Sequence, residues 1–247
     1  MDISSKYLNL MSYLMPKILV TGSGSKSEID DHHYDVIYAS NTSFLRIKNI
    51  NDINLVISDA LLFKEVDLNE HETIKGLSRK ESNKYRLEKY STINDIKVKR
   101  LVVSDSGLKI KIKSRLLEKN ISASNIKIIK SNDIWNLYLS SFSLYDLFKI
   151  FLKLSFKLKI KFIIQIILKK RMSTEFRPSL GLISIMLAMI ENPGSIIMVD
   201  GIGMIGSDGS RKAYYGHKDP FVYSQKSHTF DSIYLDIFVK TNQIKFN

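Results

Sequence analysis

The chain has 247 residues, of which 44% are apolar and 10% aromatic, enough for a sizeable hydrophobic core and too many for wholesale disorder. It contains no cysteine, which excludes disulfides, thiolate zinc sites and cysteine nucleophiles and fits a reducing cytoplasm. Its 37 basic and 25 acidic residues give a formal net charge of +12, which attracts polyanions such as nucleic acid, anionic lipid or a phosphorylated substrate.

The first fifteen residues have neither a basic start nor a clean apolar run, so we expect no secretion signal there. No stretch reaches the roughly 18 uninterrupted apolar residues of a membrane span. We therefore expect a cytoplasmic protein that is soluble or peripheral to a membrane.

Short runs of β-type residues, most of them closing on small or polar residues, predict strands along the chain. These runs lie at 17–21, 36–39, 55–58, 100–103, 126–129 and 195–199. Helices are predicted within 68–95 and at 134–142, 178–190 and 230–240. This alternation predicts an α/β fold in a single domain over 1–247: a Rossmann-like, largely parallel sheet flanked by helices, with a helical lid or insertion.

A glycine turn, Gly22-Ser23-Gly24, follows the first predicted strand. Glycine adopts positive φ and adds no side-chain bulk, so backbone amides could approach a phosphate or a nucleotide there. The dinucleotide-binding fingerprint is incomplete, because its third glycine would fall at Lys26 or Ser27. A P-loop fails as well, since Val20 stands where its first glycine would be. A plain strand end therefore stays open as the alternative.

The second predicted strand ends in Ala39-Ser40-Asn41-Thr42. Ligands of parallel sheets sit beyond the carboxyl ends of the strands, so we expect Asn41 to stand beside the Gly22 turn. Its amide can both donate to and accept from a sugar or a base edge. The alternative is an asparagine that caps the following helix.

Together with motifs in the second half, these residues resemble the bacterial sialyltransferases. In that family a first strand runs into a Gly-Asn-Gly-Pro-Ser turn, and the next strand ends in an asparagine that touches the nucleotide. Further on, the family has Arg-x-(Thr/Ser)-x-Gly opening a long apolar helix, and then a strand ending in a Gly-Ile pair. This chain has Arg177-Pro178-Ser179-Leu180-Gly181, followed by an apolar helix and Asp200-Gly201-Ile202.

The resemblance covers about 17–58 and 175–238, under half of the chain. A similar Pro-Ser-Thr-Gly-Leu stretch occurs in the animal sialyltransferases. Two positions depart from the family pattern: Ser23 replaces the asparagine of the first turn, and Gly203 replaces an aspartate after the late Gly-Ile pair. Ser23 keeps a hydrogen-bonding group, but the preferred donor could differ.

The resemblance implies a glycosyltransferase that moves an acidic 2-keto sugar, sialic acid or Kdo, from its CMP donor to a glycan or lipid-linked acceptor. It implies inversion at the sugar, and neither a cofactor nor a bound metal. Tyrosine hydroxyls are expected to hold the nucleotide phosphate, because they donate directed hydrogen bonds to an anion. The implied donor-binding residues are Gly22, Ser23, Gly24, Asn41, Ser58, Arg177, Ser179, Gly181, Gly201, Tyr214, Tyr215 and Tyr223.

A histidine is expected to deprotonate the acceptor hydroxyl, because its pKa lies near neutrality. In bacterial relatives this histidine precedes the last helix by a few residues and an acidic residue follows, which fits His228 and Asp231. Asp231 could orient the imidazole ring or cap the helix. His217 is the competing base, and an exposed His228 without a function is the remaining alternative.

The run Asp30-Asp31-His32-His33 contains metal-ligand side chains. The resemblance places it on a surface turn between the first two strands, far from the carboxyl ends where ligands sit. We therefore expect a solvated loop.

The segment 143–171 is basic and amphipathic, with Asp146 as its single acidic residue. Apolar residues recur at helical spacing from Leu144 to Leu154, whereas 157–162 alternates, so that helix and strand compete there. Lysine-rich amphipathic segments lie on anionic membranes, so we expect a peripheral location on the inner face of the cell membrane. The alternative is a core helix whose lysines face water. The basic residues are Lys149, Lys153, Lys157, Lys159, Lys161, Lys169, Lys170 and Arg171.

Nucleic acid is not an expected partner, because the aromatic residues of this segment lie on its apolar face and form no stacking platform. Two other functions stay open. One is a non-catalytic α/β protein that binds a nucleotide or polyanion, and the other is an enzyme dependent on NAD or S-adenosylmethionine that uses the same glycine turn. The motif from Arg177 to Gly181 and the place of His228 favour the transferase.

Overall fold

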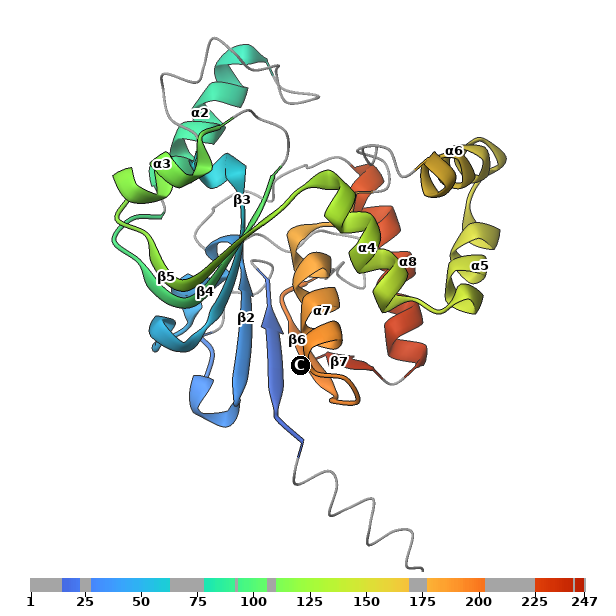
Figure 1. Cartoon of the computed structure of the whole chain (residues 1–247), viewed down its shortest axis with the longest axis horizontal. Helices are drawn as coiled ribbons and strands as arrows, with labels where there is room; N and C mark the ends of the chain where they lie inside the picture. Colours follow the sequence, from blue (N-terminus) through green and yellow to red (C-terminus); the bar gives the residue numbers. More distant parts are fainter. Residues whose placement is uncertain are drawn as a thin grey trace, which may run out of the picture.

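The computed structural model describes residues 15–22, 28–62, 78–91, 93–105, 110–168, 177–202, 225–241 and 243–246. Within these ranges one sheet has the strand order β5-β4-β3-β2-β1-β6-β7, and every neighbouring pair is parallel (Figure 1). Its strands are β1 (Ile18–Thr21), β2 (Val36–Ser40), β3 (Asn54–Ser58), β4 (Lys97–Ser104), β5 (Ser122–Ile129), β6 (Ile197–Asp200) and β7 (Ile244–Phe246).

The chain builds the sheet outward from β1 to β5 and then returns to the free side of β1 with β6. Strand order therefore reverses between β1 and β6, which pair in register from Ile18 opposite Ile197 to Thr21 opposite Asp200. In open parallel sheets such a reversal marks the crevice where ligands bind, beyond the carboxyl ends of the strands.

Helices and short 3-10 turns connect the strands. The helices are α2 (Arg79–Ser91), α3 (Ile112–Glu118), α4 (Ser131–Ser141), α5 (Leu144–Lys153), α6 (Phe156–Leu168), α7 (Leu180–Glu191) and α8 (Gln225–Lys240). The 3-10 turns are η1 (Asp31–His33), η2 (Asn41–Arg46), η3 (Ile50–Asp52) and η4 (Asp59–Leu62).

Two hydrophobic cores lie on the two faces of the sheet, because successive side chains of a strand point to opposite sides. Ile18 and Val20 of β1 pack in the core formed with α4, α7 and α8. Leu19, between them, packs in the other core with residues of η2, η4 and α3. Figure 1 shows α4, α7 and α8 together on one side, with α5 and α6 forming an outer layer beyond them. The predicted Rossmann-like α/β fold with flanking helices is confirmed.

Several element boundaries differ from the prediction. α7 begins at Leu180, because Ser179 caps it and Pro178 precedes the cap. β6 begins at Ile197, two residues later than predicted. α8 begins at Gln225, so His228 lies in its first turn and does not precede the helix.

The ambiguous segment 157–162 is helical and belongs to α6. Its Phe162 is buried, with its ring centroid 6.3 Å from that of Trp135 in α4. This contact favours a helix over a strand. A helix can bury one apolar side against α4 and expose a second one, with the lysines between the two sides. α3 and β7, which have seven and three residues, were not among the predicted elements.

Candidate functional site

Glycines bring the ends of β1 and β6 into contact with the start of α7. The backbone N–H of Gly22 donates to Asp200 O at 2.8 Å, continuing the β1–β6 pairing past the end of β1. A Cβ on Gly22 would lie 2.5 Å from both Gly201 O and Ile202 Cγ1, and a Cβ on Gly181 would lie 2.8 Å from Ile202 Cγ2. Gly201 itself has a φ of +65°. Close packing around Ile202 therefore requires these predicted glycines, independently of any ligand.

A buried arginine, Arg46, lies at the same ends of β1 and β6 and was not among the predicted site residues. Arg46 is 2% exposed and ends η2. Its Nη1 donates to Thr21 Oγ1 at 2.9 Å and to Gly22 O at 3.0 Å, and its Nη2 pairs with the Asp200 carboxylate. A guanidinium removed from water needs such partners, so this ion pair ties η2 to both strands at the reversal point.

The end of β2 is bonded to the ends of its two neighbours. Ser40 and Ser43 both donate their hydroxyls to Thr21 O, at 3.0 and 2.9 Å. Asn41 has a φ of +51°, and its Oδ1 accepts from the backbone N–H of Ser58 at 3.4 Å. The Asn41 side chain therefore bridges β2 to β3, and the N-cap position of η2 is taken by Ser40, with Asn41 as the first residue of the turn.

Asp231 of α8 holds the N-terminus of a different helix, α7. The Ser179 side chain accepts from Leu182 N at 3.2 Å, and the Ser179 backbone N–H donates to Asp231 Oδ1 at 3.1 Å. Asp231 is 2% exposed, and burial raises the pKa of its carboxyl to about 6, although the hydrogen bonds with Ser179 act in the opposite direction. The positive end of the α7 dipole also favours a carboxylate here.

Arg177 joins the start of α7 to the end of β4. Its Nη2 donates to Ser104 Oγ at 3.1 Å and to Asp105 O at 3.0 Å. Because α7 packs at the β1–β6 reversal through Gly181, the predicted motif 177–181 runs along the carboxyl edge from β4 to β6.

The described members of the predicted site all lie at this carboxyl edge, although they come from six separate segments. They are Gly22, Asn41, Ser58, Arg177, Ser179, Gly181, Gly201 and Asp231. His228 is in α8, three positions before Asp231, so their backbone positions share one side of the helix. The remaining predicted residues lie outside the described residues: Ser23, Gly24, Tyr214, Tyr215, Tyr223, the competing His217 and the side chain of His228.

The run Asp30 to His33 lies at the opposite, amino edge, just before β2. His33 pairs with Asp30 at 3.2 Å on the surface, whereas Asp31 is buried and accepts from Asn49 N at 2.7 Å. Across the described ranges, no group of three His, Cys, Asp or Glu side chains could hold a metal ion.

A polar cavity of about 330 Å³ also lies at the amino edge, between the ends of α4 and α7 and the start of β6. Its lining includes Ser140, Asn192, Ser195, Thr241 and Gln243, and the residues that line it include no ionisable side chain. Without an acid or a base, this cavity cannot supply the proton transfer that the predicted chemistry needs.

Comparison with protein-family models, with curated proteins and with solved structures gives no match to this chain. Only the α/β fold and the geometry of the carboxyl edge therefore bear on function. That edge combines an arginine, Arg177, with the N-terminus of α7, and both kinds of group bind phosphate-bearing ligands in parallel sheets, whereas the Gly22 amide is already bonded to Asp200 O.

Proposed function

We propose that the protein is a CMP-sugar-dependent glycosyltransferase that moves sialic acid or Kdo to a glycan or lipid-linked acceptor with inversion. The observation that supports this most is the convergence of Gly22, Asn41, Ser179 and Asp231 at the carboxyl edge. These residues belong to motifs far apart in the sequence, and they lie along the carboxyl edge of the sheet, which includes the point of strand-order reversal where ligands of such sheets usually bind.

In this proposal Arg177 and the amide end of α7 lie towards the nucleotide phosphate, because both favour negative charge. The acceptor hydroxyl attacks the anomeric carbon of the sugar, and its proton passes to the His228 imidazole. The bond from that carbon to the phosphate oxygen breaks, and its electron pair leaves with CMP. Asp231, one helical turn from His228, stabilises the imidazolium that forms.

The proposal includes a peripheral location on the inner face of the cell membrane, where lipid-linked acceptors lie. Within the part of the chain that the structure describes, no helix has the length and apolar character needed to cross a bilayer. The proposed reaction uses no metal, as the resemblance to the bacterial sialyltransferases implies.

The test is the variant His228→Ala, assayed for transfer from CMP-sialic acid and CMP-Kdo and for CMP binding by thermal shift. We expect turnover to fall by about 100-fold or more, because a positioned base contributes that much, while the stabilisation by CMP persists. His32→Ala is the matched control, because His32 is exposed at the amino edge. Near-normal turnover of His228→Ala would transfer the role of base to His217.

The main alternative is a nucleotide-binding protein or an enzyme that uses NAD or S-adenosylmethionine. The packing of Gly22 and Gly181 against Ile202 favours these alternatives, because that packing explains both glycines without a bound CMP. Against NAD, β2 ends at Ser40 and is followed by Asn41, whereas dinucleotide sites place an acidic residue near that point for the ribose. A thermal-shift panel of CMP, both CMP-sugars, UDP-sugars, NAD and S-adenosylmethionine separates these classes. A shift with NAD or S-adenosylmethionine and none with CMP would reject the transferase.

A further inference from the structure

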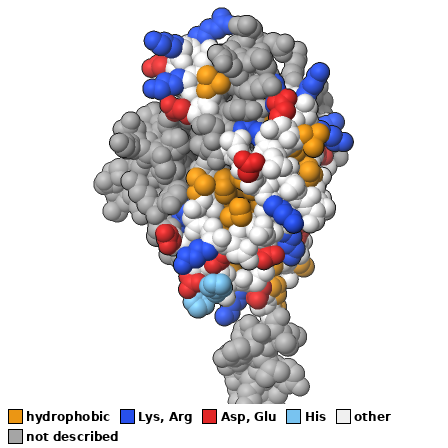
Figure 2. All heavy atoms as spheres, turned by 90° about the vertical axis from the view of Figure 1, so that its left-hand side faces the viewer, with side chains coloured by type: hydrophobic (Ala, Val, Ile, Leu, Met, Phe, Trp, Pro, Cys, Tyr) orange, Lys and Arg blue, Asp and Glu red, His pale blue; other side chains and the backbone are white. Residues whose placement is uncertain are grey.

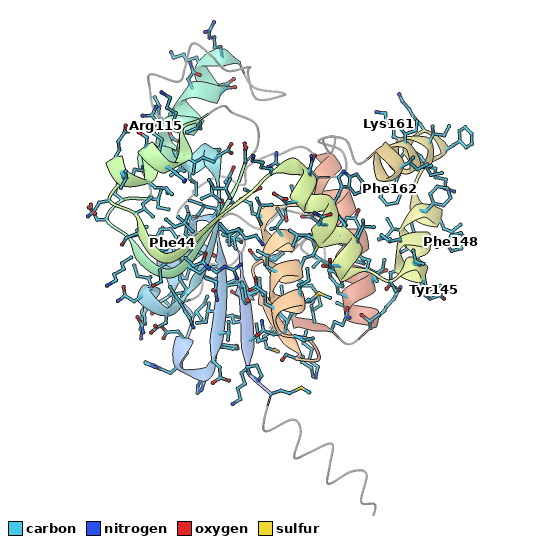
Figure 3. The ribbon with its side chains drawn as sticks, viewed as in Figure 1. Phe44, Arg115, Tyr145, Phe148, Lys161 and Phe162 are labelled. Atoms are coloured by element: carbon cyan, nitrogen blue, oxygen red, sulfur yellow. The ribbon has the colours of Figure 1, made fainter. Side chains whose placement is uncertain are left out.

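α5 and α6 carry a large apolar surface that faces solvent. Nine large apolar side chains on these two helices are between 43% and 85% exposed. In Figure 3, Tyr145 and Phe148 extend from α5 on the side away from the sheet. These nine residues form what we name the α5–α6 surface: Leu144, Tyr145, Phe148, Leu152, Phe156, Ile160, Ile163, Ile164 and Ile167.

The two helices are fixed to the body of the protein by other side chains. Ile150 of α5 and Phe162 of α6 are buried, and Phe162 packs against Trp135. Lys153 donates to Asp236 of α8 at 2.7 Å. The exposed apolar residues recur three or four positions apart along each helix, so each helix has one buried and one exposed apolar side. Exposed apolar surfaces of this extent on folded proteins mark interaction sites.

Positive charge surrounds the α5–α6 surface. The two helices contain five lysines and a single acidic residue, Asp146, which forms the capping box of α5 with Ser143. Lys149 Nζ lies 4.1 Å from the centre of the Tyr145 ring. Lysine stems can lie along apolar surface while their ammonium groups stay in polar surroundings, so the surface matches the boundary between lipid tails and headgroups.

A cleft of about 240 Å³ between α5 and α8 adjoins this surface. Lys149, Lys153 and Lys240 line it together with apolar side chains and one carboxylate, Asp236. Lys153 and Lys240 both donate to Asp236, and these bonds hold the pKa of its carboxyl below the usual range. Three ammonium groups against one carboxylate leave net positive charge, which complements a lipid phosphate.

We propose that the α5–α6 surface docks on an anionic phospholipid bilayer, with its apolar side chains at the level of the headgroups and its lysines towards the phosphates. A second copy of the chain fits less well, because a two-fold interface would place this lysine-rich surface against itself. The opposite side of the molecule, around α2, α3 and β5, faces the viewer in Figure 2, where basic and acidic side chains are interspersed with small apolar groups. Docking does not depend on the transfer reaction, so binding can be tested without a sugar donor.

The first test is co-sedimentation with vesicles of phosphatidylcholine alone and of equal parts phosphatidylcholine and phosphatidylglycerol. The variant carries Leu144→Ser, Phe156→Ser and Ile167→Ser, because these side chains are 85%, 80% and 71% exposed and contribute little to the fold. We expect the partition to anionic vesicles to fall by about tenfold or more, since the apolar area that enters the interface is lost. Leu117→Ser on α3 is the matched control, because Leu117 is 81% exposed on a different surface.

The second test reverses charge. Lys157→Glu on α6 should reduce binding to anionic vesicles by about tenfold, because each basic residue near the surface contributes to the attraction. The same reversal at the exposed Lys113 of α3 should leave binding unchanged. Equal binding to neutral and anionic vesicles would overturn the proposal, as would unchanged binding of the triple serine variant. A vesicle-free dimer that the triple variant abolishes would instead assign the surface to a second copy.

Discussion

Asp231→Asn should make the protein more stable at neutral pH. Burial raises the pKa of the Asp231 carboxyl from its ordinary 3.8 to about 6, so the folded state binds this proton more tightly than the unfolded state does. Below about pH 4 the group is protonated in both states and imposes no cost. As pH rises through about 4 to 6 the unfolded carboxyl ionises first, and stability falls by about 3 kcal/mol for a shift of about two pKa units.

Asparagine removes this cost, because it carries no charge and its oxygen can still accept from Ser179 N. Urea unfolding at about pH 4 and about pH 8, followed by fluorescence of the single tryptophan, Trp135, measures the difference. Asp236→Asn on the same helix is the control with the opposite sign. Its lysine partners lower its pKa, so Asp236 stabilises the fold above its ordinary pKa and loses that contribution as pH falls. A variant at position 231 that is less stable than the parent at about pH 8 would refute the reasoning.

Arg46→Met should destabilise the protein by about 3 to 5 kcal/mol, because it leaves Asp200 without its guanidinium at the β1–β6 reversal, and urea unfolding measures this. Arg100→Met, which breaks the more exposed pair with Glu191, should cost about 1 kcal/mol, and equal costs would contradict the role given to Arg46. Gly181→Ala should cost about 1 to 3 kcal/mol through its clash with Ile202, and less when Ile202 is also alanine; a purely additive double variant would exclude that contact as the cause.

Most of the fold follows from the apolar runs, because buried parallel strands consist of β-type residues that close on a turn. The elements that were not predicted lack such signals. β7 has only three residues, and it is a strand because its backbone pairs with β6. The paired residues Ile197 and Ile244 are 47 positions apart in the sequence. The alternating segment of α6 fits either type of element, and contacts with distant residues such as Trp135 place Phe162 on the inner side of a helix. Local sequence does not contain that information.

The candidate site, like the fold, could be predicted from the sequence only in part. Residues at strand ends could be predicted to converge, since the carboxyl ends of parallel strands share one edge. The groups that bind one another there could not. Arg46 and Asp200 are 154 residues apart, and Arg177 reaches Ser104 across 73 residues. Arg46 offers one local signal, a lone arginine between the apolar residues 44–45 and Ile47, which indicates a buried charge without naming its partner.

α8 connects the candidate site with the proposed docking surface. Asp236 binds Lys153 of α5 at one end of the helix, and Asp231 holds the start of α7 nearer the other. At 1.5 Å of rise per residue, the backbone positions of His228 and Asp236 are about 12 Å apart along the helix axis. An acceptor lipid held in the cleft beside Asp236 would then need to present its sugar about two helical turns further along α8, at the position of His228. If both proposals hold, vesicles should therefore increase transfer to lipid-linked acceptors and leave transfer to free sugars unchanged.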